Sequence, residues 1–135
     1  MSGERGPLLF CLVAGGGDVV TGLLLLAAPE LVLRLLGIER PEGSLELFRF
    51  VGVFVASVGA AYLYPWLRGG TGQRHRLATA IEITAGIRIA VAVFLVFAVA
   101  TREMGSPWLT VGTYDALVAA AQLALLARGF FGRAS

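Results

Sequence analysis

The sequence predicts an all-α protein: a four-transmembrane-helix bundle with a short amphipathic surface helix between the first and second spans. Of its 135 residues, 57% are hydrophobic, against about 45–50% in soluble domains. Charged residues make up 15% of the chain and gather between four long apolar runs. Each run is long enough to cross a bilayer, because a helix needs about 20 residues to span the hydrocarbon core. We therefore expect a single membrane domain over residues 1–135.

The first span is expected at about residues 8–28, in an apolar run that Asp18 interrupts. A signal peptide is the competing interpretation, since Arg5 precedes the run. The run is too long for the apolar region of a signal peptide, and it carries an acid near its middle. We therefore interpret it as a transmembrane helix.

The segment PELVLRLLGIER, residues 29–40, predicts a short amphipathic helix at 30–37 on the membrane surface. Its apolar residues recur at helical spacing, with charged residues set against them (Leu31, Leu35 and Ile38 against Glu30 and Arg34). Gly37 is expected to end this helix. Ser44 is expected to cap the next one.

The second span is expected at about 45–66, with Pro65 helping to stop the helix. Tyr62, Tyr64 and Trp66 cluster at its end, as aromatic residues do at a membrane–water interface. A basic loop follows at 68–76, RGGTGQRHR.

The third span is expected at about 77–100 and the fourth at about 107–127, joined by a short turn. Trp108 is a second interface anchor. Stripes of small residues favour close helix packing in lipid; they run along the second and fourth spans (Gly52, Ala56 and Ala60; Gly112, Ala116, Ala120 and Ala124).

Arginine distribution predicts the orientation of the chain, since cytoplasmic loops carry an excess of positive charge. With four spans, six arginines share the side of the two termini and the 68–76 loop, and four share the other side with five glutamates. We therefore expect a multi-pass protein of the bacterial inner membrane, with both termini in the cytoplasm.

Charged residues inside the spans are the most informative feature, because each costs at least about 2.5–3.5 kcal/mol at the bilayer centre and must face the interior and pair. Asp18, Arg88 and Asp115 lie at similar depth, if a helix rises about 1.5 Å per residue. Arg49 lies further out and could reach Asp115. Glu82 lies about 120° around its helix from Arg88 and needs another partner. Gln122 shares a face with Asp115.

Two interpretations of this cluster stay open. It could be an ion-pair network that fixes how the helices dock, or a polar site for a substrate, a quinone headgroup or protons. Intramembrane ionisable residues favour function by default, yet arginine balanced by acids is also typical of a structural network.

The sequence lacks the motifs of several kinds of cofactor-binding and catalytic site. His75 is the only histidine and Cys11 the only cysteine, so one chain offers neither bis-histidine haem ligation nor an internal disulfide. There is no nucleotide or metal motif, so the cofactor is unknown. The dispersed arginines argue against nucleic-acid binding. We expect a protein that is not an enzyme.

The chain resembles the small DoxX-like bacterial membrane proteins in four features. These are the first span with its surface helix, GGGDVVTGLLLLAAPELVLRLLG, the second span, RFVGVFVASVGAAYLYPW, the arginine of the third span and the aspartate of the fourth. The resemblance implies a four-helix bundle. The family takes its name from a subunit of a thiosulfate:quinone oxidoreductase, but no catalytic residues of the family map onto this chain.

The leading hypothesis for function is a membrane protein whose interior polar site binds a small molecule or a quinone-like lipid. The alternative is an accessory subunit of a larger membrane complex, since the chain has almost no mass outside the bilayer. A third hypothesis is a proton-coupled transporter that uses Glu82, which needs dimerisation to provide enough helices. The expected partners are the lipid bilayer and other membrane subunits or further copies of this chain.

Overall fold

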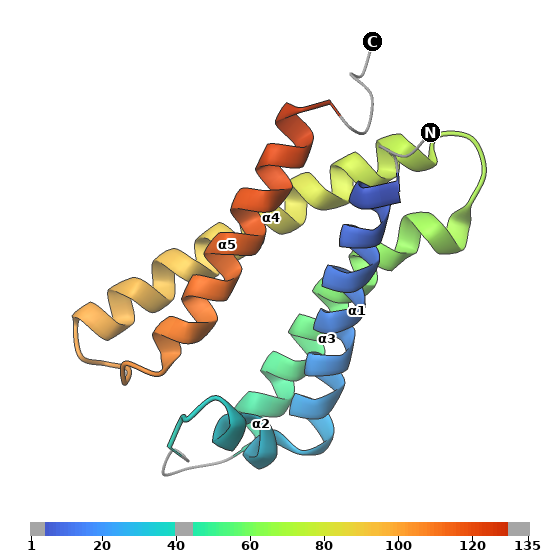
Figure 1. Cartoon of the computed structure of the whole chain (residues 1–135). Coiled ribbons are helices and arrows are strands. Elements are labelled where there is room, and N and C mark those ends of the chain that lie inside the picture. The colour runs from blue at the N-terminus through green and yellow to red at the C-terminus, as the bar shows by residue number, and fades with distance from the viewer. Residues whose placement is uncertain (1–4, 40–44, 130–135) are drawn as a thin grey trace.

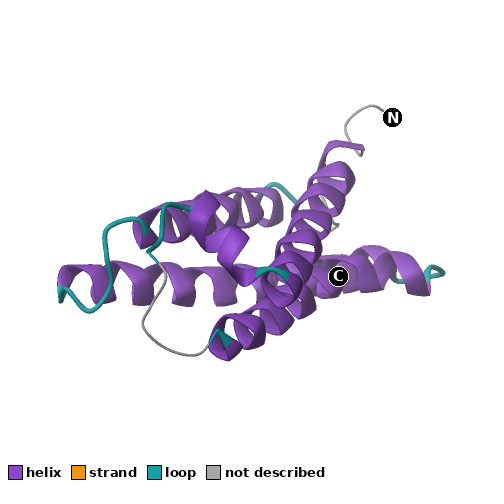
Figure 2. Cartoon of the chain, turned by 90° about the horizontal axis from the view of Figure 1, so that it is seen from below, coloured by secondary structure: helices purple, strands orange, loops and turns teal. Residues whose placement is uncertain are grey.

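The residues that the structure describes fold into five helices, four of them long and apolar enough to cross a membrane. A computed structural model describes residues 5–39 and 45–129. The helices are α1 (Arg5–Ala27), α2 (Pro29–Leu35), α3 (Glu46–Arg68), α4 (Gln73–Ala100) and α5 (Trp108–Ala127). In the described residues every element is a helix, as Figure 2 shows. The predicted all-α class, with four spanning helices and a short helix after the first, is confirmed.

The long helices form two antiparallel pairs, α1 with α3 and α4 with α5 (Figure 1). The first turn of α1 and the last turn of α5 lie at the same end of the molecule. Near that end the pairs share a core of Cys11, Tyr62, Leu77 and Ile81, against which side chains of α5 also pack. At the other end, the rings of Phe48 and Trp108 stack with centroids 6.3 Å apart.

Glycines bring α1 and α3 into backbone contact. A Cβ built on Gly59 would lie 2.6 Å from the carbonyl oxygen of Gly15, and one built on Gly52 would lie 2.7 Å from that of Gly22. Real Cβ atoms do not approach so closely, so only glycine fits there. Backbone approach at small residues is how membrane helices gain packing energy, because lipid is as apolar as the helix surfaces.

The predicted stripes of small residues are only partly right. Gly52 and Gly112 are buried, but Ala60 is exposed, and so are three alanines of α5 (Ala116, Ala120 and Ala124). A four-residue repeat advances about 40° per step around a helix of 3.6 residues per turn, so it drifts off the buried face. The buried small residues recur instead every seven residues, which drifts only about 20°: Gly15 and Gly22, Gly52 and Gly59, Gly112 and Ala119.

The loop between the second and third spans is shorter than predicted. Pro65 does not stop α3 but lies buried inside it, and the helix runs on to Arg68. Membrane helices tolerate proline because neighbouring groups satisfy the freed carbonyl. The chain turns instead at Gly69, Gly70 and Gly72, which all have positive φ, and α4 begins at Gln73.

The short helix α2 begins with Pro29 and its last residue is Leu35; Gly37, predicted to end it, follows the C-cap with a φ of +68°. The N–H of Ile38 donates to the carbonyl of Leu33 at 2.9 Å, and that of Gly37 donates to the carbonyl of Arg34 at 3.1 Å. This pair of bonds is the Schellman motif, which satisfies the last carbonyls of a helix. The predicted cap Ser44 lies outside the described residues.

Candidate functional site

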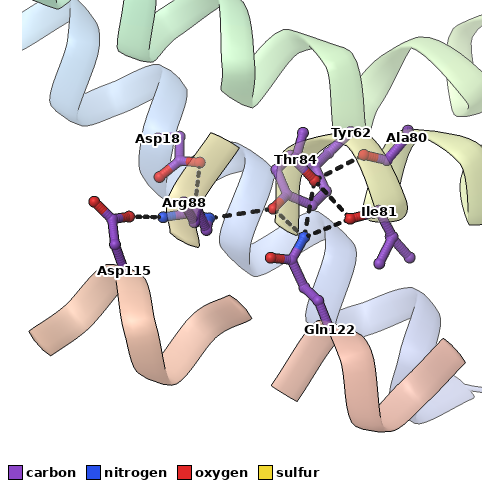
Figure 3. A network of polar contacts seen from close by, with 8 residues as sticks. All are labelled: Asp18, Tyr62, Ala80, Ile81, Thr84, Arg88, Asp115 and Gln122. Atoms are coloured by element: carbon purple, nitrogen blue, oxygen red, sulfur yellow. Dashed lines mark hydrogen bonds and ion pairs between the residues drawn. The ribbon is translucent and has the colours of Figure 1, made fainter. Parts of the chain in front are cut away.

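Arg88 is the centre of a charged cluster inside the helix bundle. Its side chain is 5% exposed, and its two terminal nitrogens donate to Asp18 Oδ2 and Asp115 Oδ1 (Figure 3). Its Nε donates to the hydroxyl of Tyr62 at 3.4 Å. The guanidinium of α4 thus bonds to α1, α5 and α3 at once.

The packing of each helix explains why the two acids reach Arg88. Asp18 lies between Gly15 and Gly22 in α1, and its Cβ would lie 2.8 Å from a Cβ on Gly59. Asp115 lies between the buried Gly112 and Ala119 in α5, and a Cβ on Gly112 would lie 3.4 Å from Cβ of Leu95 in α4. The small residues therefore let the helices approach, and the acids between them face the interior.

The cluster carries one more negative than positive formal charge, because one guanidinium serves two carboxylates. Each carboxylate uses one oxygen for Arg88; Asp18 Oδ1 and Asp115 Oδ2 have no partner in the described part of the chain. Neither oxygen is fully shielded from its surroundings. The arrangement can therefore accept further hydrogen-bond donors or positive charge at these two oxygens.

Tyr114 flanks the cluster on the accessible side. The guanidinium carbon of Arg88 lies 5.6 Å from the centre of the Tyr114 ring, within the range of a cation–π contact. The tyrosine is 50% exposed, whereas the Asp115 side chain beside it is 14% exposed. On the surface of α5, the exposed ring of Tyr114 therefore lies beside the partly exposed carboxylate of Asp115.

A second layer of polar contacts lies next to the cluster. Gln122 Nε2 is 2.5 Å from the hydroxyl of Tyr62, 2.8 Å from that of Thr84 and 3.3 Å from the carbonyl of Ile81 (Figure 3). Thr84 in turn donates to the carbonyl of Ala80 at 2.7 Å. Oε1 of Gln122 is buried without a hydrogen-bond partner in the described residues. This layer joins α3, α4 and α5 through side chains that are all buried.

Of the residues expected at the site, the structure brings four together: Asp18, Arg88 and Asp115 in direct contact, and Gln122 through Tyr62. Whether they bind a ligand stays a prediction. Tyr62, Thr84 and Tyr114 are additional members. We expected Tyr62 in an interface belt, but it is fully buried. It lies ten residues after Gly52 and three after Gly59, which places it on the glycine face of α3.

Arg49 lies apart from the cluster. It forms an ion pair with Glu46 at 3.0 Å instead of reaching Asp115. It lines a cavity of about 370 Å³ together with Ala28, Glu30 and Arg34. The (i, i+3) spacing of Glu46 and Arg49 on one helix makes this local pair the easier one to form.

Glu82 also lies apart from the cluster, on the exposed surface of α4. In the described ranges it has neither a hydrogen bond nor an ion pair. Ile81 and Thr84 are buried and lie about 100° and 160° around the helix from Glu82. Glu82 therefore points away from the buried face of α4.

Comparisons of the chain with protein-family models, with curated proteins and with solved structures found no match. In the described residues, no group of three or more His, Cys, Asp and Glu side chains could hold a metal ion. The resemblance to the DoxX-like proteins stays a prediction.

Proposed function

We propose that this small integral membrane protein binds a small, positively charged organic solute at the cluster of Asp18, Arg88 and Asp115. The observation that carries the proposal is the pairing of two carboxylates with one guanidinium. An excess negative charge is costly inside a membrane. A cationic ligand would remove that excess and supply donors to the two oxygens without partners.

The chemistry around the cluster favours an ammonium group as the cation. A primary ammonium carries three donors and no acceptor, which matches the two open carboxylate oxygens. Tyr114 adds an aromatic ring, and cations are attracted to aromatic faces. Its half-exposed position on α5 makes it a contact for the apolar part of an amphiphilic amine.

A quinone-like lipid is the second candidate ligand for the same site. Tyr114 favours this ligand, because its ring is half exposed on the outside of the bundle and lies next to the buried guanidinium of Arg88. A quinone carbonyl could accept a remaining N–H of Arg88. It would leave the excess negative charge in place, so the charge balance favours the amine.

An accessory role in a larger membrane complex is supported by a different surface. Three alanines at four-residue spacing, Ala116, Ala120 and Ala124, lie exposed on α5. Small residues let a second helix approach closely in lipid. This role is compatible with ligand binding. Transport through Glu82 has no comparable support, since Glu82 lies outside the cluster.

We place the protein in a bacterial inner membrane with both termini in the cytoplasm, and among the DoxX-like proteins, as further parts of the proposal. The arginine distribution supports the orientation. The pattern of an aspartate, glycines, an arginine and a second aspartate over four spans supports the family.

Calorimetric titration of the purified protein in detergent with benzylammonium tests the proposal, with benzyl alcohol as the neutral control. We expect saturable binding of the ammonium and none of the alcohol. Asp115→Asn keeps an acceptor for Arg88 but makes the cluster neutral, so binding should fall at least about tenfold, as expected for the loss of one charged contact of about 1.5–3 kcal/mol.

Glu82→Gln is the matched control, because it makes the same acid-to-amide change outside the cluster. It should bind benzylammonium like the unmodified protein. Equal binding by Asp115→Asn and the unmodified protein would contradict the proposal. Saturable binding of a short-chain ubiquinone instead of the amine would select the second candidate.

A further inference from the structure

An apolar groove runs along the outer surface between α3 and α4. None of Asp18, Arg88 and Asp115 lines it, and it adjoins the polar layer beside them through Thr84. It has a volume of about 580 Å³, and its walls are largely apolar side chains such as Phe54, Ala61, Ile83 and Ile87. His75 and Arg76 line its end, at the first turn of α4. The groove is therefore apolar along its length and basic at the end formed by His75 and Arg76, which we call its mouth.

The mouth of this groove has no aspartate or glutamate among the residues that line it. The nearest acid along α4 is Glu82, which is not among the residues that line the groove. An anion at the mouth would thus meet arginine without facing a competing carboxylate of α4.

Arg76 is held at the mouth by neutral groups. Its terminal nitrogens donate to the carbonyls of Gly69 at 2.5 Å and Thr71 at 3.3 Å. No carboxylate pairs with it among the described residues. Its Nε is buried and has no acceptor there. The positive charge of Arg76 is therefore positioned but not neutralised by a described carboxylate.

The length of the groove fits one lipid chain. Along α4 it extends from Arg76 to Ile87, which is about 16 Å at 1.5 Å per residue. One leaflet contributes about 15 Å, half of the hydrocarbon core. A chain that starts at the mouth would reach the middle of the bilayer at the far end of the groove.

We propose that the α3–α4 groove binds an anionic phospholipid, with one acyl chain between the helices and the phosphate at Arg76 and His75. The charge at the mouth selects the anionic headgroup, and the apolar walls accept the chain. A second copy of this chain is the competing occupant. The groove mouth disfavours it, because a symmetric partner would bring a second set of arginines to the same place.

Native mass spectrometry of the delipidated protein in detergent tests the proposal, with equimolar phosphatidylglycerol and phosphatidylcholine of identical acyl chains. We expect phosphatidylglycerol to bind preferentially. Arg76→Gln should reduce this preference about fivefold, the factor that corresponds to one basic residue near a lipid surface. Arg128→Gln, on exposed Arg128 after α5, removes the same charge outside the groove and should not change the preference.

A second pair of variants tests the groove itself, independently of the loop that Arg76 supports. Ala61→Leu fills the groove, whereas Ala60→Leu adds the same volume at an exposed neighbour that does not line it. We expect Ala61→Leu to lose bound lipid and Ala60→Leu to retain it. Equal binding of the two lipids, or equal retention by the two leucine variants, would overturn the proposal. So would a dimer that only Ala61→Leu dissociates.

Discussion

Gln122 of α5 and Tyr62 of α3 are in direct contact, with Nε2 of the amide 2.5 Å from the phenolic oxygen. These helices belong to different pairs, so the contact joins the two halves of the bundle. The same hydroxyl accepts a hydrogen bond from Nε of Arg88 at 3.4 Å. Tyr62 therefore connects the charged cluster to the amide layer beside it.

Tyr62→Phe should destabilise the protein by about 1 kcal/mol. It removes the hydroxyl that accepts from Nε of Arg88, while Nε2 of Gln122 keeps Thr84 and the carbonyl of Ile81 as acceptors. A side-chain hydrogen bond between membrane helices contributes about 0.6 kcal/mol on average and up to about 1.7. Unfolding in mixed micelles of increasing sodium dodecyl sulfate fraction measures the change. Tyr64→Phe, on the exposed Tyr64, is the matched control and should have no effect. Equal stability of both variants would contradict a role for the Tyr62 hydroxyl.

Gly59→Ala should destabilise the bundle by about 1–3 kcal/mol, the usual cost of overpacking. The new methyl group would meet the backbone of Gly15 at 2.6 Å, so α1 and α3 would have to separate. The same unfolding assay measures the loss. Gly17→Ala is the control on α1, because a Cβ there meets nothing within 4 Å. It should be neutral or stabilising by up to about 1 kcal/mol, since alanine favours the helix. A Gly59→Ala protein as stable as Gly17→Ala would disprove the close approach.

Much of the fold could be predicted from the sequence, because a bilayer requires about 20 apolar residues per span. The predicted span at 8–28 agrees with α1, and that at 107–127 agrees with α5, to within a few residues. The end of α3 could not be predicted in this way. Pro65 usually breaks a soluble helix, and only the packing around it shows that it lies inside this one.

The charged part of the site could also be predicted, since depth along each helix placed Asp18, Arg88 and Asp115 at one level. The rotation of the helices could not be predicted from depth. It decides that Arg49 pairs with Glu46 and that Glu82 is exposed. Tyr62 was missed because aromatic clustering near a span end suggests an interface. Its register with Gly52 and Gly59 was the signal that it faces inward.

The orientation predicts opposite labelling of two loops. In a Cys11→Ala background, Thr71→Cys should be protected from a membrane-impermeant maleimide in intact cells and labelled after lysis, because it lies in the loop assigned to the cytoplasm. Ser106→Cys, before α5, should be labelled in intact cells. Both positions are exposed, so a difference reports sidedness and not burial. The reverse pattern would show that the termini lie outside the cytoplasm and that the orientation predicted from the arginine distribution is wrong.

Arg88→Met should destabilise the protein more than any other single change in the cluster. It leaves Asp18 and Asp115 buried without a cation, and breaking a buried ion pair from one side costs about 3–5 kcal/mol. The triple variant Asp18→Asn, Arg88→Met, Asp115→Asn removes all three charges and should recover most of this loss, because no uncompensated charge remains. Unfolding in mixed micelles compares the two. If the triple variant were as unstable as Arg88→Met, lost packing and hydrogen bonds, not charge imbalance, would account for the effect. A triple variant that folds well but no longer binds benzylammonium would show that the charges are needed for ligand binding and not for stability.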